Sequence, residues 1–327
     1  MSCVAAGEEG RSKEKNPPRT KDVVLKMSTR LPLEIEIYPY LLDHRFEGKA
    51  VLPAVEAMQL LAVSTQKHLP NTDIRFIENA KFDKFFYIEP YTTQDTTPDT
   101  NIAEAFNEIE MSANGGITAK LITKTRSKKA GITRVKEHAV LQFSGGKPDI
   151  KPFSLDTVSG QIKRGFNIPS DKLYNDLVPF GPAYHNIKDT LFVSEKGAIG
   201  SIQAPKQSMT NNLKMPLGSG FPFDAAFHAA CAWGQRYLAV VGFPVGFDKR
   251  IVIQPTRPGN SYICLILPVN LTTDIFTFDI WLYDLNGILF EAVYGVQMKD
   301  ISAGRMKPPK WVIKKGVKRS RNAEIRK

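Results

Sequence analysis

Each half of this 327-residue chain carries one long apolar helix together with strands that alternate apolar and polar residues. This repeated layout constrains the fold more than any other feature. A single helix beside several antiparallel strands buries its apolar face by packing across a curved sheet. The pattern therefore predicts an α+β protein in which this arrangement occurs twice. The helices are expected at 53–68 and 223–241, and the strands at 33–38, 82–88, 103–112, 117–126, 132–143, 189–195, 197–204, 249–256, 260–268, 274–284 and 287–299.

Changes in composition divide the chain into five parts. The polar first segment, with two adjacent prolines, is typical of a flexible leader, and a Gly-Gly-Lys-Pro string at 145–148 opens a linker. The basic end is interpreted as a solvated tail. The predicted parts are a leader over 1–30, an N-terminal half over 31–150, a linker over 151–165, a C-terminal half over 166–306 and a tail over 307–327.

The net charge of +11 lies at the two ends of the chain. Residues 1–30 contribute +3 and residues 307–327 contribute +8, so the middle is formally neutral. Among the basic residues of the tail only Trp311 offers an aromatic platform, which argues against nucleic-acid binding.

Three cysteines are too few and too scattered for a disulfide framework or a zinc site, which fits a reducing cytoplasm. The sequence shows neither a signal peptide nor an uncharged span of ~20 residues. We therefore expect a soluble cytoplasmic protein.

Three short motifs carry the candidate chemistry. The first places His44, Gly48 and Pro53 at the spacing His-x3-Gly-x4-Pro, directly before the first helix. The second is Phe180-Gly-Pro-Ala-Tyr184. The third, Asp224-Ala-Ala-Phe-His228, places an acid and a histidine four residues apart on the second helix, where both face the same way.

These motifs, in this order and at these distances, resemble those of polyketide synthase dehydratase domains over roughly 31–302. The central motif is similar to their Tyr-Gly-Pro-x-Phe with both aromatics exchanged, and the third is similar to their Asp-x3-Gln/His. Two departures are Ala54, where the family usually has glycine after the proline, and Pro222 in an unusual lead-in to Asp224. Both bear on substrate preference more than on the chemistry.

The resemblance implies a double hotdog, which is two sheet-wrapped helices side by side, with an active site in a tunnel between them. It also implies a substrate held on the phosphopantetheine of an acyl carrier protein and no other cofactor. Because no ketosynthase, reductase or carrier segment is seen, we expect a free-standing dehydratase.

His44 and Asp224 are the two predicted catalytic groups. A neutral imidazole, with an ordinary pKa near 6.5, can remove the α-proton of a 3-hydroxyacyl thioester. Asp224 would protonate the departing hydroxyl if an apolar tunnel raised its pKa. His228 is expected to orient Asp224, and backbone N–H groups near Gly48 or at the start of the first helix are candidate donors to the thioester oxygen.

The remaining residues of the motifs are candidate lining of the substrate tunnel: Pro53, Phe180, Gly181, Pro182 and Tyr184. The aromatic residues of the central motif are equally consistent with a place in the tunnel wall and with a place in the hydrophobic core. Glu56 is expected at the helix surface or behind the site. No metal constellation is present, and His68, His138 and His185 have no motif partners.

The sequence thus predicts a dehydratase that forms 2-enoyl thioesters in polyketide or specialised fatty-acid synthesis. Two alternatives remain open: an enoyl isomerase or hydratase on the same scaffold, and a non-catalytic hotdog that binds acyl carrier protein. Other synthase components are further candidate partners, and a monomer and a homodimer fit equally well.

Overall fold

A twelve-stranded antiparallel sheet runs through the part of the chain that the computed structural model describes, which is residues 27–88, 102–113, 115–126, 133–145, 150, 155–206, 215–272 and 274–317. The strand order is β1-β5-β6-β7-β4-β11-β14-β13-β12-β10-β9-β8. Strands of the N-terminal half occupy one end of the sheet and those of the C-terminal half the other. The two halves join where β4 pairs with β11.

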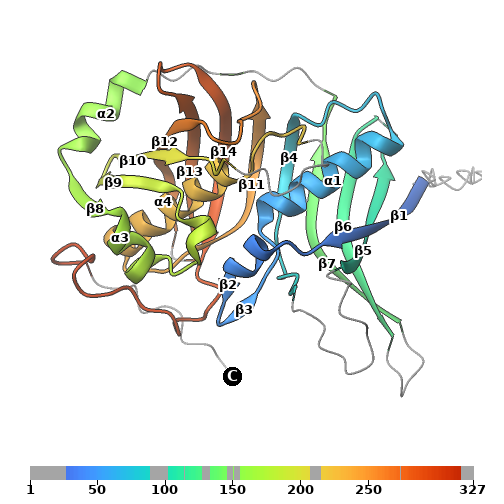
Figure 1. Cartoon of the computed structure of the whole chain (residues 1–327), viewed down its shortest axis with the longest axis horizontal. Helices are drawn as coiled ribbons and strands as arrows, with labels where there is room; N and C mark the ends of the chain where they lie inside the picture. The colour runs from blue at the N-terminus through green and yellow to red at the C-terminus, as the bar shows by residue number, and fades with distance from the viewer. Residues whose placement is uncertain are drawn as a thin grey trace, which may run out of the picture.

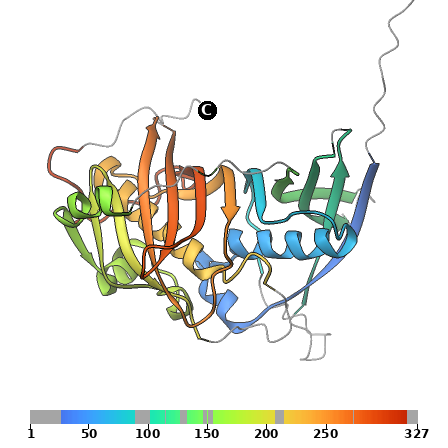
Figure 2. The same cartoon turned by 90° about the horizontal axis from the view of Figure 1, so that it is seen from above.

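Two long helices, α1 (Ala54–His68) and α4 (Phe221–Leu238), each lie in the hollow of one half of the sheet (Figure 1). Seen from above, α1 lies across the N-terminal strands while α4 lies behind the C-terminal ones (Figure 2).

The strands are β1 (Met27–Glu36), β2 (Arg45–Phe46), β3 (Lys49–Ala50), β4 (Phe76–Lys81), β5 (Ile102–Met111), β6 (Ile117–Arg126), β7 (Thr133–Phe143), β8 (Phe166–Pro169), β9 (Ile187–Ser194), β10 (Gly197–Gln203), β11 (Phe243–Val252), β12 (Ser261–Leu271), β13 (Ile275–Asp284) and β14 (Leu289–Lys299). The short helices are η1 (Pro39–Asp43), α2 (Leu155–Lys163), α3 (Ser170–Lys172), η2 (Leu173–Leu177) and η3 (Pro182–Tyr184).

The two long helices differ in how much of their surface is buried. Val55, Met58, Leu61 and Ala62 form the buried stripe of α1, as their helical spacing predicts. In α4, by contrast, nearly every residue up to Gln235 is buried, Asp224 and His228 included. A helix that is apolar on all sides must be packed against other elements on all sides. Strands β9, β10, β12 and β13 contact α4 and bury it.

Three sequence predictions about local structure were wrong. A strand was predicted at 82–88, but the strand in this region, β4, ends at Lys81. Residues 82–88 form mostly irregular structure. The predicted linker contains α2, whose Ile162 is fully buried in a small core against β9 and β10. The predicted leader gives way to β1 already at Met27, and its earlier residues lie outside the described part of the chain.

The basic tail is also ordered over residues 307–317. Val312 is fully buried, and its carbonyl accepts a hydrogen bond from Arg236 at 3.0 Å. The Trp311 indole donates to Asp176 at 2.9 Å. This part of the tail therefore packs on the C-terminal half, because Trp311 and Val312 find partners there; residues 318–327 lie outside the described chain.

A buried ion pair lies near the joint between the two halves. Arg250 of β11 donates two hydrogen bonds to Glu291 of β14, at 3.0 and 2.7 Å, and both side chains are almost fully buried. The guanidinium also lies over the Phe223 ring of α4 and contacts the Met58 sulfur of α1 at 3.7 Å. Arg250 therefore touches both long helices at once.

Candidate active site

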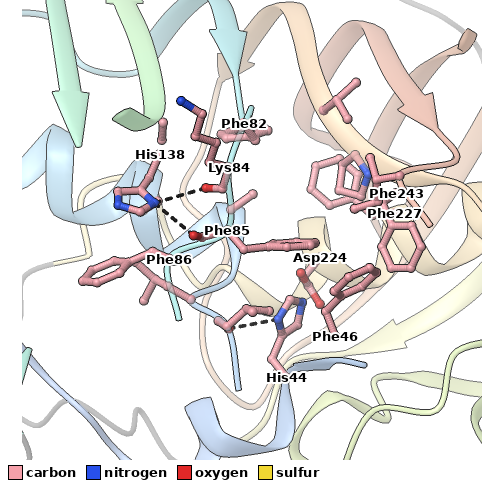
Figure 3. A pocket seen from close by; sticks show the side chains of 18 of the residues that line it. His44, Phe46, Phe82, Lys84, Phe85, Phe86, His138, Asp224, Phe227 and Phe243 are labelled. Carbon is pink, nitrogen blue, oxygen red and sulfur yellow. Dashed lines mark hydrogen bonds between the residues drawn. The ribbon is translucent and has the colours of Figure 1, made fainter. Parts of the chain in front are cut away.

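An apolar cavity of about 400 Å³ lies between the two halves. Helices α1 and α4, strands β6, β7 and β11, and the 82–87 segment all contribute to its wall. Its polar groups near α4 include His44 and Asp224 (Figure 3). His228 of α4 also lines the cavity. The aromatic wall consists of Phe46, Phe82, Phe85, Phe86, Tyr87, Phe180, Phe227 and Phe243. A water-poor cavity with a few convergent polar groups is the usual form of a small-molecule site.

Two contacts to Val51 fix the position of His44. The Val51 N–H donates to the His44 carbonyl at 2.9 Å, and the His44 Nδ1 lies 3.1 Å from the Val51 carbonyl oxygen. Because a carbonyl only accepts hydrogen bonds, Nδ1 carries the proton and the neutral ring keeps a free lone pair on Nε2. Burial lowers the pKa of His44, so the neutral form persists below the ordinary titration range of histidine. His44 is therefore held as a base.

Asp224 lies in the first turn of α4, with its carboxylate turned toward the imidazole of His44 (Figure 3). Its Oδ2 is 3.0 Å from Nε2 of His228, one turn further along the helix, although the two atoms are out of line for a good hydrogen bond. Both side chains are almost fully buried. The 3.0 Å contact is an ion pair whenever His228 is protonated, so the two side chains can hold one proton between them.

The expected pKa of Asp224 was wrong in direction. Burial does raise the pKa of this carboxyl, but the adjacent His228, with a smaller contribution from His44, outweighs burial, and the pKa of Asp224 is lowered. The carboxyl alone is thus not a neutral acid. The available proton belongs to the Asp224–His228 pair taken together.

Asp43 joins the His44 segment to the Phe180–Tyr184 motif. Its carbonyl accepts from the Gly181 N–H at 2.8 Å, and its carboxylate accepts from the Ala183 N–H at 2.9 Å. The Phe180 ring packs at a tilt against that of His44, with the ring centroids 4.3 Å apart. The glycine is required, because a Cβ at position 181 would lie 2.3 Å from the Asp43 side chain.

Replacing Gly181 with alanine should displace Asp43 and, with it, the adjacent His44. We expect a loss of about 1–3 kcal/mol of unfolding free energy from the overpacking. Turnover should fall about tenfold or more, because a small misplacement of a catalytic group is costly. Gly160→Ala in α2 is the matched control, since a Cβ there meets nothing within 4 Å. Denaturant unfolding and steady-state rates would check both, and a G181A protein with unchanged turnover would contradict this role.

Of the predicted site residues, the structure brings His44, Asp224, His228 and Phe180 together in one cavity. The others lie elsewhere. Gly48 sits at the exposed tip of the β2–β3 hairpin with φ +82°, so it serves the turn and not the thioester. Pro53 precedes α1 as its N-cap. Gly181, Pro182 and Tyr184 do not line the cavity. Pro182 is exposed, and Tyr184 is buried with its ring 5.1 Å from that of His44.

Most of the aromatic wall was not predicted from the sequence. Phe227 could have been found, because it lies three residues after Asp224 on the same face of α4. The cluster Phe82, Phe85 and Phe86 gave a weaker signal, since a strand was expected there. His138 anchors this segment: its Nδ1 lies 3.1 Å from the Phe85 carbonyl and its Nε2 2.8 Å from Thr123 Oγ1. It is a structural histidine of the wall.

Two features are absent from the described residues. No group of three or more His, Cys, Asp or Glu side chains is placed to hold a metal ion in that part of the chain. Likewise, none of its helices combines the length and the apolar character needed to cross a membrane.

Neither a family model nor a curated protein matches this sequence, but solved structures match its fold. A dehydratase domain of a mycocerosic acid synthase-like polyketide synthase superposes with a TM-score of 0.64 at 15% identity, over 86% of this chain and 97% of that one. The dehydratase domain of RzxB from Pseudomonas fluorescens gives 0.64 at 16% identity, over 83% and 94%. A trans-acyltransferase polyketide synthase enoyl-isomerase gives 0.59 at 16% identity, over 84% and 99%.

The chain therefore has the α+β double-hotdog fold of polyketide synthase dehydratase and enoyl-isomerase domains, as its sequence predicted. At these identities the likeness establishes the fold. The chemistry must be argued from the residues in the cavity.

Proposed function

We propose that the protein is a dehydratase that removes water from a 3-hydroxyacyl thioester on an acyl carrier protein and yields the 2-enoyl product. Polyketide or specialised fatty-acid synthesis is the proposed setting. One observation carries this proposal: a histidine with a free ring nitrogen and a proton-sharing Asp–His pair face the same apolar cavity.

These side chains account for every proton that moves in the elimination. His44 Nε2 takes the α-proton, the α–β double bond forms, and the C–O bond at the β-carbon breaks. The hydroxyl takes the proton of the Asp224–His228 pair and leaves as water. His44 then carries the extra proton and the pair lacks one, so proton return from His44 to the pair resets the site. Each transfer is a general acid or base step.

Basic side chains near the cavity support a carrier-bound substrate. Arg45, Lys84 and Lys136 line the cavity; the first two are exposed and Lys136 is half-buried. Cations there would favour the phosphate of a phosphopantetheine arm and an acidic carrier protein. The unpaired, buried thiols of Cys231 and Cys264 support a reducing, cytoplasmic setting.

A double-bond shift is the second candidate, because the fold is shared with a structure described as an enoyl-isomerase. Isomerisation also needs a base at the α- or γ-carbon, which His44 could supply. It does not need an acid for a departing hydroxyl. The Asp224–His228 pair thus favours dehydration.

Mass spectrometry of synthetic thioesters would test the proposal. The protein is incubated with 3-hydroxyacyl-pantetheine and with 2-enoyl-pantetheine of several chain lengths. We expect the hydroxyacyl compound to lose one water. A double bond that proton NMR shows to have moved, at unchanged mass, would support the isomerase instead. Carrier-protein binding without turnover of any thioester would contradict both and leave the non-catalytic alternative.

A further inference from the structure

We propose that the acyl chain of the substrate extends from the reacting carbons along α4, that its far end is an unsubstituted hydrocarbon, and that Cys231 limits its length. This inference rests on the proposed dehydratase function and deepens it by naming the class of acyl chain. It gives Cys231 a role in specificity, because this residue lines the same cavity as His44 and Asp224.

One face of α4 forms a continuous wall of the cavity. The lining residues of this helix are Asp224, Phe227, His228 and Cys231. Their spacing of three, four and seven residues places them on one side of the helix. The helix rises about 10 Å from Asp224 to Cys231. The cavity therefore continues along α4 well beyond the group that handles the hydroxyl.

The amino end of this wall offers polar atoms to the reacting part of the substrate. Asp224 Oδ2 and Nδ1 of His228 are buried, and neither has a well-aligned hydrogen-bond partner among the described residues. A hydroxyl on the β-carbon would supply one. The reacting carbons are then held at this end of α4, and the rest of the acyl chain must extend away from them.

The side of the cavity formed by β7 and the 82–87 segment is polar. Its lining includes charged and hydrogen-bonding side chains: Asp83, Lys84, Lys136 and His138. A pantetheine arm carries amides, a hydroxyl and a phosphate, which lose water on binding and need polar partners in return. This side of the cavity therefore fits the arm.

The side along α4 is apolar. Phe227 and Cys231 are only 3% and 8% exposed, and Phe227 and Phe243 lie on the side of the cavity opposite Lys84 (Figure 3). Hydroxyl or keto groups on the acyl chain would lose their hydrogen bonds to water here without replacement, whereas hydrocarbon gains from burial. Beyond His228, the described lining residues of α4 and around the start of β11 carry no charge: Cys231, Gly242, Phe243, Pro244 and Val245.

The space behind the Cys231 sulfur is filled. Gln235, one turn further along α4, donates to this sulfur at 3.4 Å and to the Leu177 carbonyl at 3.0 Å. The Gly242 backbone also hydrogen-bonds to the thiol. A Cβ on Gly242 would lie 2.2 Å from the Phe276 ring, so this backbone cannot move back. A longer side chain at position 231 can therefore extend only into the cavity.

The thiol of Cys231 suits a wall that holds a 2-enoyl product. Such a product is an electrophile that a thiolate can attack at its β-carbon. Burial raises the pKa of Cys231 to about 11, so the thiol stays protonated at neutral pH and behaves as a small apolar side chain.

Chain-length profiles of Cys231→Met and Cys231→Ala test this inference. The value of kcat/KM is measured for 3-hydroxyacyl-pantetheines with saturated tails of increasing length. Methionine narrows the far end of the cavity, so the longest chains that the wild type accepts should lose a factor of about ten or more, and short chains much less. Alanine leaves more room, so the longest accepted chain should become longer.

Two further variants provide the comparison. Cys264→Ala changes the other described cysteine, which is fully buried in β12 and does not line the cavity, so it should keep the wild-type profile. Ala139→Met narrows the polar side, where Ala139 of β7 lines the cavity. It should lower kcat/KM by a similar factor at every chain length, because every substrate carries the same arm.

Protection of Cys231 from a thiol reagent gives a readout that needs neither turnover nor a variant. Methyl methanethiosulfonate converts a thiolate to its methyl disulfide and releases methanesulfinate. Peptide mass spectrometry would follow this reaction in the wild type at alkaline pH, with saturated acyl-pantetheines that lack the 3-hydroxyl. Long chains should slow the modification of Cys231, and short chains should not.

The outcomes separate the two proposals. An unmoved length profile in both Cys231 variants would overturn this inference, and so would protection that does not depend on chain length. A profile shortened by Ala139→Met instead would place the acyl chain on the polar side. Length-dependent protection in a protein that dehydrates no thioester would support the acyl site and reject the proposed function.

Discussion

Replacing His44 with asparagine should lower the turnover of a 3-hydroxyacyl thioester by a factor of about 10²–10⁴. The amide N–H of asparagine can still donate to the Val51 carbonyl, which the imidazole contacts at 3.1 Å, so the loop should keep its shape. The amide has no basic nitrogen to take the α-proton. We therefore expect a large fall in kcat with little change in substrate affinity or in unfolding free energy, measured by steady-state kinetics and urea denaturation.

His68→Asn provides the comparison for this variant, because His68 is exposed at the end of α1 and far along the helix from the cavity. It should retain full activity. Wild-type turnover in His44→Asn would show that the α-proton leaves by another route, and the assignment of the base would then be wrong.

Replacing Arg250 with methionine should cost about 3–5 kcal/mol of unfolding free energy. The change removes both hydrogen bonds to Glu291 and leaves a fully buried carboxyl without its cation. Burial already raises the pKa of Glu291, and Arg250 counteracts this rise. Because Arg250 also touches Met58 and Phe223, the loss should loosen the contact of both long helices with the sheet.

The double variant Arg250→Met with Glu291→Leu should recover most of that loss, since an apolar pair of similar volume leaves no buried charge. Arg75→Met is the surface control: Arg75 pairs with Asp73, but both are largely exposed, and such pairs contribute about 0–1 kcal/mol. If the double variant were less stable than Arg250→Met, the ion pair would not be the reason for the destabilisation.

Strong periodicity made most of the fold predictable from the sequence. The strand predicted at 117–126 matches β6, and the helix predicted to end near His68 is α1. The prediction failed where packing decides the structure. Residues 82–88 alternate like a strand, yet Phe82, Phe85 and Phe86 line a cavity instead of extending the sheet. The segment at 155–163 and the basic tail have weak local signals, and they are ordered by contacts with the C-terminal half.

The motifs identified the candidate reacting groups but not their electrostatics. His44, Asp224 and His228 were predicted from spacing, and one cavity contains them. The direction of the Asp224 pKa could not be predicted, because burial and the neighbouring histidines act in opposite directions and only distances decide between them. Glu56 was expected at the helix surface or behind the site, but its hydrogen bond to Tyr40 could not be predicted, because no sequence pattern joins residues sixteen positions apart.

The central claim is that His44 and the Asp224–His228 pair act on the same two carbons of one acyl chain. A crystal structure with a non-reactive 3-hydroxyacyl-pantetheine analogue would test this most directly. We predict the α-carbon at about 3–3.5 Å from Nε2 of His44 and the hydroxyl within about 2.6–3.2 Å of Asp224 or His228. An acyl chain bound in the cavity with its hydroxyl directed away from that pair would contradict the claim.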